Sequence, residues 1–64
     1  MIPGTIKMWK EVEGWGFIEG DDGADYFVNI ANVRKGQKLQ VNAQVKFDVI
    51  QGHRGPEAEN VTLF

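Results

Sequence analysis

Gly14-Trp15-Gly16-Phe17-Ile18-Glu19-Gly20 decides the fold of this chain, together with a second stretch, Asp25-Tyr26-Phe27-Val28-Asn29-Ile30. Side chains alternate between the two faces of a β-strand, so Trp15 and Phe17 point in the same direction. If the second stretch pairs with the first as a strand, Phe27 joins them and three aromatic rings lie on one sheet surface. Such a row of rings is either part of a core or a platform on which bases stack.

The length and composition restrict the kind of protein this is. With 64 residues the chain makes one domain, residues 1–64, near the lower size limit for folding alone. It has no cysteine and one histidine, which excludes disulfides and multi-histidine metal sites and leaves little for nucleophilic catalysis. We therefore predict no catalytic residues, no metal and no cofactor. No apolar run approaches the ~20 residues of a membrane helix, and the start lacks the features of a signal peptide, so we expect a cytoplasmic protein without a membrane partner.

The charged residues are unevenly distributed. The formal net charge is −2, which counts mildly against nucleic-acid binding, since nucleic-acid binders tend to be basic. Acidic and basic residues nevertheless form separate groups along the chain. Their separation predicts one neutral-to-basic face on an acidic molecule.

Glycines and prolines divide the chain into short segments, which favours β structure with frequent turns. The first strand is expected to place Ile6 and Met8 on one face and Trp9 on the other. Ala31, Asn32 and Val33 are compatible with one short helical turn, and residues 52–56 with a long turn. The expected strands cover residues 4–10, 15–19, 25–29, 44–51 and 57–63. Five short antiparallel strands without a covering helix cannot bury both faces of an open sheet, so we predict an all-β, five-stranded antiparallel barrel of the OB type.

Strand alternation predicts a small core that excludes the aromatic rings of Trp15, Phe17 and Phe27. A chain of this size forgoes roughly 1.5–3 kcal/mol for each large side chain left outside its core, which favours a functional use of the rings. The alternative is an edge-to-face cluster that only stabilises the sheet. The expected core consists of Ile6, Ile18, part of Tyr26, Val28, Val33, Val45, Phe47 or its neighbours, Ala58 and Val61.

The two aromatic stretches resemble known sequence motifs. Gly14-Trp15-Gly16-Phe17-Ile18 resembles the first ribonucleoprotein motif of cold-shock domains, and Tyr26-Phe27-Val28-Asn29-Ile30 resembles the second. Gly4-Thr5-Ile6-Lys7 and residues 52–62 are also similar to the family, so the resemblance covers nearly the whole chain in one order and spacing. It implies an OB-type barrel that binds single-stranded RNA or DNA with little sequence preference. It also implies action as an RNA chaperone that keeps transcripts unpaired.

The resemblance also implies which residues bind. Met8 stands where the family has a stacking tryptophan, Asn29 replaces its histidine, and Ile30 replaces a phenylalanine. Glu13 replaces a lysine. Because each stacked ring is worth ~1–3 kcal/mol, we predict weaker binding than is typical of the family. The implied nucleic-acid-binding residues are Lys7, Met8, Trp9, Trp15, Phe17, Phe27, Asn29 and Ile30.

Two questions stay open from the residues alone. Trp9 is suited to packing as well as to binding, because a β-bulge changes which face it joins. The aromatic face is also suited to binding a protein partner or a second copy of the chain, since exposed apolar patches serve either purpose. We expect a monomer, with a dimer through the aromatic face as the alternative.

Overall fold

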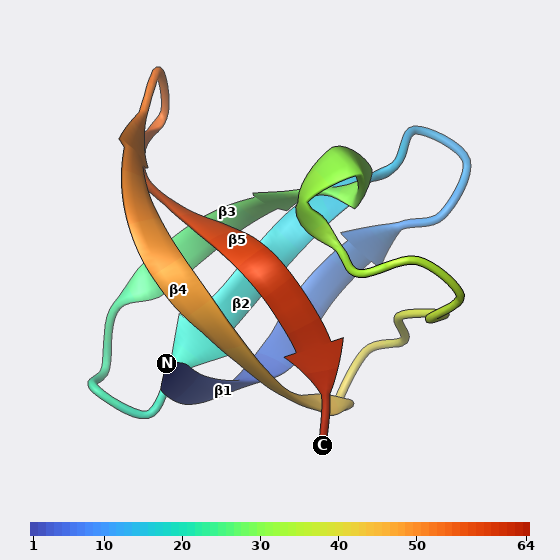
Figure 1. Ribbon diagram of the computed structural model, residues 1–64, viewed down its shortest axis with the longest axis horizontal. Coiled ribbons are helices and arrows are strands. Elements are labelled where there is room, and N and C mark those ends of the chain that lie inside the picture. The colour runs from blue at the N-terminus through green and yellow to red at the C-terminus, as the bar shows by residue number, and fades with distance from the viewer.

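Five strands close into a barrel in this computed structural model, which describes residues 1–64 (Figure 1). The strands are β1 (Ile2–Lys10), β2 (Trp15–Gly20), β3 (Asp25–Asn29), β4 (Gln44–Gly52) and β5 (Gly55–Leu63), and one 3-10 helix, η1 (Ile30–Asn32), follows β3. The order around the barrel is β1-β2-β3-β5-β4. The predicted all-β barrel of the OB type and its short helical turn are confirmed.

One strand pair runs in parallel, contrary to the expected all-antiparallel barrel. β3 and β5 pair in parallel, with Phe27 opposite Glu57 and Val28 opposite Ala58, whereas the other four pairs are antiparallel. The reason is geometric: an odd number of strands around a closed barrel cannot alternate in direction throughout. The parallel pair joins two strands that are separated along the chain by η1 and β4.

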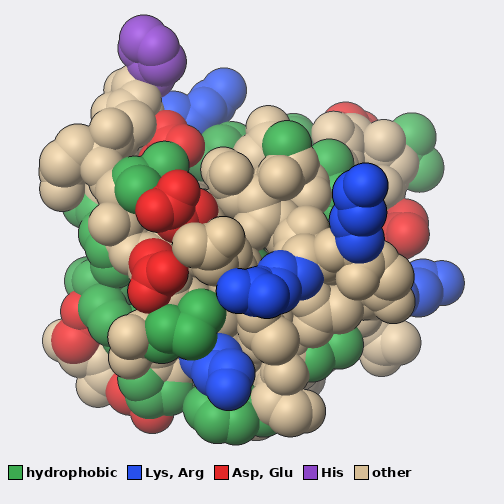
Figure 2. All heavy atoms as spheres, viewed as in Figure 1, with side chains coloured by type: hydrophobic (Ala, Val, Ile, Leu, Met, Phe, Trp, Pro, Cys, Tyr) green, Lys and Arg blue, Asp and Glu red, His purple; other side chains and the backbone are tan.

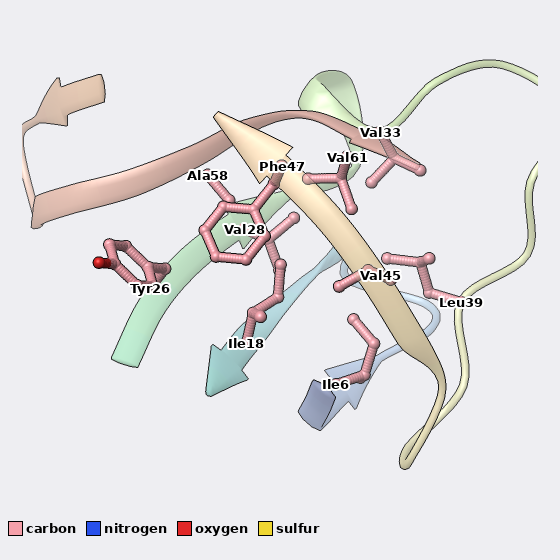
Figure 3. Close-up of a cluster of buried hydrophobic side chains, with 10 residues drawn as sticks. All are labelled: Ile6, Ile18, Tyr26, Val28, Val33, Leu39, Val45, Phe47, Ala58 and Val61. Atoms are coloured by element: carbon pink, nitrogen blue, oxygen red, sulfur yellow. The ribbon is translucent and has the colours of Figure 1, made fainter. Parts of the chain in front are cut away.

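The core is small and mostly aliphatic, as predicted (Figure 3). Every residue expected in the core is buried, and Phe47 is the largest fully buried side chain. Sequence reasoning missed Leu39, which is only 2% exposed although it lies in the loop between η1 and β4. The core cluster is Ile6, Ile18, Tyr26, Val28, Val33, Leu39, Val45, Phe47, Ala58 and Val61.

The loop of residues 33–43 is tied to the end of β5. The Gln37 side chain donates from Nε2 to the Val61 carbonyl at 3.1 Å and accepts at Oε1 from the Leu63 amide at 2.5 Å. The Arg34 amide also donates to the Val61 carbonyl, at 3.0 Å. These bonds hold the loop against the barrel, so Leu39 is buried.

A β-bulge in β1 changes which side chains face outward. Ile6 pairs with Ile18 and Met8 with Phe17, so Lys7 is an extra residue without a partner in β2. The bulge reverses the alternation beyond it. The expectation that Met8 shares the face of Ile6 was therefore wrong: Met8 lies opposite Phe17 on the outer face.

The connection between β4 and β5 is tighter than expected. Gly52 pairs directly with Gly55, which leaves a two-residue turn of His53 and Arg54 where a long turn was predicted. Gly55 has φ of +85°, a conformation that glycine adopts without steric cost. His53 and Arg54 therefore form the tip of the β4–β5 hairpin. The hairpin projects from the upper left of the barrel in Figure 1.

The turn between β2 and β3 contains hydrogen bonds to the Asp22 carboxylate. The Tyr26 hydroxyl donates to Asp22 Oδ2 at 2.5 Å, and the Ala24 amide donates to Asp22 Oδ1 at 3.1 Å. Both bonds favour the ionised carboxylate, with the tyrosine bond the larger cause, and lower the pKa of Asp22 below its ordinary 3.8. The same bond raises the pKa of Tyr26 above its ordinary 10.0.

We expect acid to remove this stabilisation. Because the pKa of Asp22 is lower in the folded chain, its contribution is present above about pH 4 and is lost as pH falls through the folded pKa. The free energy of unfolding, measured with urea from about pH 6 to 2, should therefore fall less steeply in Asp22→Asn than in the wild type. Gly23→Ala, in the same turn, should keep the wild-type pH dependence. Superimposable profiles for Asp22→Asn and wild type would contradict the prediction.

Candidate nucleic-acid interface

Trp15, Phe17 and Phe27 lie together on the outer face of β2 and β3, and we call these three residues the aromatic surface. The pairing of Phe17 with Phe27 across the two strands places their side chains on one face. Trp15 and Phe27 are stacked, with ring centroids 5.9 Å apart and planes at 28°. Phe17 is nearly perpendicular to both, at 6.2 Å from Trp15 and 5.8 Å from Phe27. None of the three belongs to the core cluster, so the parity argument is confirmed.

Phe27 is less accessible than its position suggests. It is only 7% exposed, whereas Trp15 and Phe17 are half-buried. Its two ring neighbours cover its sides, and the Arg54 guanidinium lies over the ring at 4.7 Å from the centroid. Arg54 comes from the tip of the β4–β5 hairpin, which reaches β3 because β5 pairs with it. Phe27 therefore has little surface free for a ligand, in contrast to Trp15 and Phe17.

We expect Arg54→Ala to lower the free energy of unfolding by about 0.5–1 kcal/mol, because a partly exposed cation–π contact is lost. Urea unfolding measures the change. Arg34→Ala is the matched control, since Arg34 is exposed and lies over no ring. Equal stability of the two variants would show that the contact with Phe27 contributes nothing.

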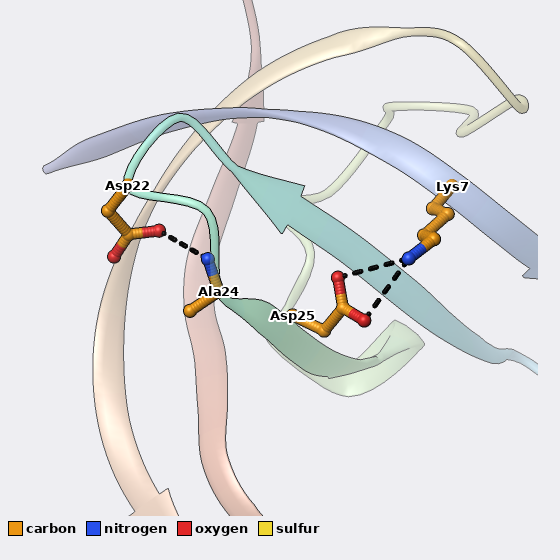
Figure 4. A network of polar contacts seen from close by, with 4 residues as sticks. All are labelled: Lys7, Asp22, Ala24 and Asp25. Atoms are coloured by element: carbon orange, nitrogen blue, oxygen red, sulfur yellow. Dashed lines mark hydrogen bonds and ion pairs between the residues drawn. The ribbon is translucent and has the colours of Figure 1, made fainter.

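Lys7 is paired with a carboxylate beside the aromatic surface. Its Nζ lies 3.2 Å from Oδ2 and 3.3 Å from Oδ1 of Asp25 (Figure 4). Both side chains are about half exposed, and such a surface pair is worth little. Lys7 can therefore leave Asp25 for a phosphate at low cost. Two aspartates between β2 and the start of β3 have structural partners, because Asp22 accepts hydrogen bonds and Asp25 forms this ion pair.

The other predicted binding residues occupy different places. Met8 extends the aromatic surface from β1, because it lies opposite Phe17. Trp9 is half-buried and packs against the core, and its Nε1 donates to Glu11 Oε1 at 3.2 Å. Asn29 accepts from the Ala31 amide at 2.9 Å and caps η1. Ile30 is 47% exposed at the start of η1.

Arg54 was missed as a neighbour of this surface. Nothing local in the hairpin sequence predicts that its guanidinium reaches a ring on β3. The contact depends on the register between β4 and β5 and on the parallel β3–β5 pair, and both are properties of the closed barrel.

A closed barrel of five short strands, with aromatic rings on the outer face of two neighbouring strands, defines an OB-type protein. The family model described as "'Cold-shock' DNA-binding domain" matches residues 2–64. The chain therefore belongs to the cold-shock domain family, whose members are generally nucleic-acid-binding proteins and not enzymes. The structure contains no helix with the length and apolar character needed to cross a membrane.

Several relatives match along nearly their full length. The chain is 40% identical over 62 residues to cold shock-like protein CspC of Bacillus cereus, covering 94% of this chain and 95% of that protein. It is 41% identical over 66 residues to a cold shock protein of Arthrobacter globiformis, covering 98% of both. Among solved structures, Drosophila Unr CSD456 superposes with a TM-score of 0.82 at 28% identity, over 98% of this chain and 26% of that one.

Proposed function

We propose that this protein binds single-stranded RNA or DNA by stacking bases on the aromatic surface, with little sequence preference. The observation that carries the proposal is the cluster of Trp15, Phe17 and Phe27 outside the core of a 64-residue chain. Any base has a flat face that stacks on such rings, which is why this mode of binding tolerates different sequences. Holding bases in this way keeps a transcript unpaired, so we assign the protein an RNA-chaperone role in the cytoplasm.

The arrangement of the rings supports weaker binding than the family norm. Phe27 is covered by Arg54, so Trp15 and Phe17 are the rings with accessible surface. Met8 adds a polarizable thioether beside Phe17, a weaker partner for a base than an aromatic ring. Since each stacked base contributes ~1–3 kcal/mol, two accessible rings give a modest total.

Few cations surround the aromatic surface, which predicts a shallow dependence on salt. Lys7 is paired with Asp25, and Arg54 lies over Phe27. Each phosphate neutralised on a single strand steepens the plot of log affinity against log salt by about 0.7. One or two phosphate contacts therefore give a slope of about −0.7 to −1.4 for this site.

A fluorescence titration tests the proposal. Oligothymidine, or an unstructured RNA of the same length, is added while tryptophan emission is followed at low salt and again at higher salt. We expect saturable quenching with a shallow salt slope, because Trp15 lies within the aromatic surface. An absence of quenching at low salt would overturn the proposal, and a steep slope would show that phosphate contacts dominate this site.

A second candidate function is binding of a protein partner or of another copy through the same face. The exposed Ile30, next to Asn29 at the end of β3, favours it, as does the net charge of −2. Sedimentation at several protein concentrations, with and without oligothymidine, separates the two. Self-association that oligothymidine does not disturb, together with unquenched tryptophan, would favour this second function.

A further inference from the structure

The basic residues are concentrated in one acid-free segment. Residues 26–47 carry four Lys/Arg and no Asp/Glu, while the other 42 residues carry three Lys/Arg and nine Asp/Glu. This segment thus has a formal charge of +4 within a chain of net charge −2. We call its four cations, Arg34, Lys35, Lys38 and Lys46, the basic surface.

The fold brings these four residues towards one side of the barrel. Arg34 and Gln37 are hydrogen-bonded to the end of β5 at Val61, and this places the first part of the loop of residues 33–43 beside that strand. The loop then crosses to β1, where Asn42 and Ala43 are hydrogen-bonded to the backbone of Ile6. Lys46 lies on the start of β4, opposite Thr62 of β5. Lys and Arg side chains gather over the centre and right of this side, and Asp and Glu side chains lie mainly towards its left (Figure 2).

None of the four cations has a carboxylate partner. The ion pairs of the molecule are those of Lys7 with Asp25 and of the N-terminus with Asp48. Arg34, Lys35 and Lys38 are exposed, and Lys46 lies over the Phe64 ring at 5.7 Å from its centroid. Four like charges without counter-charges repel one another, and a bound polyanion would relieve that repulsion.

The basic surface lies across the barrel from the aromatic surface. β2 lies between β1 and β3, whereas β4 lies between β5 and β1, so the outer faces of β2 and of the β4–β5 wall point in different directions. β4 and β5 cross in front of β2 in Figure 1, which places the outer face of β2 on the far side. The molecule measures 24 × 24 × 18 Å, so a short oligonucleotide on one surface leaves the other free.

We propose that the basic surface binds the phosphate backbone of a second nucleic-acid strand, so that one protein molecule bridges two strands or two distant segments of one RNA. The contact between the basic surface and the phosphate backbone is inferred from charge alone, whereas the bridging also rests on the proposed function of the aromatic surface. A phosphate backbone suits this surface because flexible, separate lysines match a line of charges and need no shape complementarity. Its four members are all charged, whereas the centres of stable protein interfaces are depleted of charged residues.

Binding at the basic surface should depend steeply on salt, unlike binding at the aromatic surface. Three or four neutralised phosphates give a slope of about −2 to −3. Raising salt from about 50 to 200 mM should therefore weaken this site about 20- to 50-fold. Backbone NMR shifts of residues 34–38 and 46, followed during oligothymidine titrations at the two salt concentrations, report this site separately from tryptophan quenching.

A two-colour bridging assay tests the inference. Two oligothymidines, one with a donor dye and one with an acceptor, cannot pair with each other, so energy transfer between them requires a protein that holds both. We expect transfer with the wild type at limiting protein, and at least a fivefold loss in Arg34→Gln/Lys35→Gln with tryptophan quenching unchanged. Val12→Glu/Gln51→Glu, which changes the net charge by the same amount at exposed positions outside this surface, should retain the transfer.

The possible results separate this inference from the proposed function. With Phe17→Ala, transfer should fall while the oligothymidine-induced shifts at residues 34–38 persist, and those shifts alone would support the backbone site. Three results would overturn the inference: no transfer with the wild type, equal transfer in Arg34→Gln/Lys35→Gln, or sedimentation showing that bridging comes from a dimer. The inference would also be overturned if polyglutamate shifted the backbone NMR signals of residues 34–46 as strongly as oligothymidine does. The preferred partner would then be an acidic protein.

Discussion

Replacing Phe17 by alanine is expected to weaken the binding of oligothymidine by about 5- to 150-fold, the equivalent of about 1–3 kcal/mol for one stacked base. Phe17 stands at the centre of the aromatic surface, with Trp15 and Phe27 on either side and Met8 opposite on β1. Its removal takes away one of the two accessible rings. It also removes the edge-to-face contacts that Phe17 makes with Trp15 and Phe27. Tryptophan quenching at low salt measures the loss, because both tryptophans remain in the variant.

Phe64→Ala is the matched control for this experiment. This substitution also replaces a phenylalanine by alanine, but Phe64 is 74% exposed and lies beside Lys46, away from the aromatic surface. The quenching curve of Phe64→Ala should follow that of the wild type. Phe17→Leu, which keeps an apolar side chain, separates loss of stacking from loss of folding, and unchanged affinity in both Phe17 variants would contradict the stacking role.

Gly16→Ala is expected to lower the free energy of unfolding by about 3 kcal/mol or more, because the new methyl group has no space. A Cβ at Gly16 would overlap the Met8 carbonyl oxygen and lie 2.9 Å from Cε3 of Trp9. The carbonyl belongs to the backbone of the bulged strand β1, so it cannot move as a side chain can. Urea or thermal unfolding measures the effect, with loss of the folded state as its extreme form.

Gly36→Ala is the control for conformational effects. Gly36 has φ of +82° and no atom within 4 Å of the position that a Cβ would occupy, so alanine there costs only the backbone strain of about 1–2 kcal/mol. Gly16 has the opposite character: its backbone is not left-handed, and the whole cost is steric. If Gly16→Ala proved no less stable than Gly36→Ala, the close approach of β1 to β2 would be refuted.

Strand alternation alone predicted correctly which side chains of β2 and β3 face the core. The alternation in residues 14–20 and 25–30 placed Ile18 and Val28 inside and Trp15 and Phe17 outside, and the structure agrees. The alternation failed in β1 beyond Ile6. There the bulge at Lys7 reverses the faces, so that Met8 lies with Phe17 and Trp9 packs towards the core. The position of a bulge depends on the pairing with the partner strand, so the sequence of β1 alone does not predict it.

Contacts between distant segments could not be predicted from the sequence for a similar reason. Leu39 looked like a loop residue, but the hydrogen bonds of Gln37 to β5 bring that loop over the barrel and bury it. Arg54 looked like an ordinary turn residue, but the register of the β4–β5 hairpin places it over Phe27. Each depends on a pairing partner more than 20 residues away, which local alternation cannot encode.

The sequence by itself determined that the chain forms a small closed barrel with rings outside its core, since strand alternation and the burial of apolar side chains act residue by residue. It also determined that the cations and carboxylates are separated along the chain. Only the tertiary structure decided which rings stay accessible and where the cations gather. Closing five strands into a barrel joins β3 to β5 in parallel, covers Phe27 with Arg54, and sets the basic surface across the barrel from the aromatic surface of Trp15, Phe17 and Phe27.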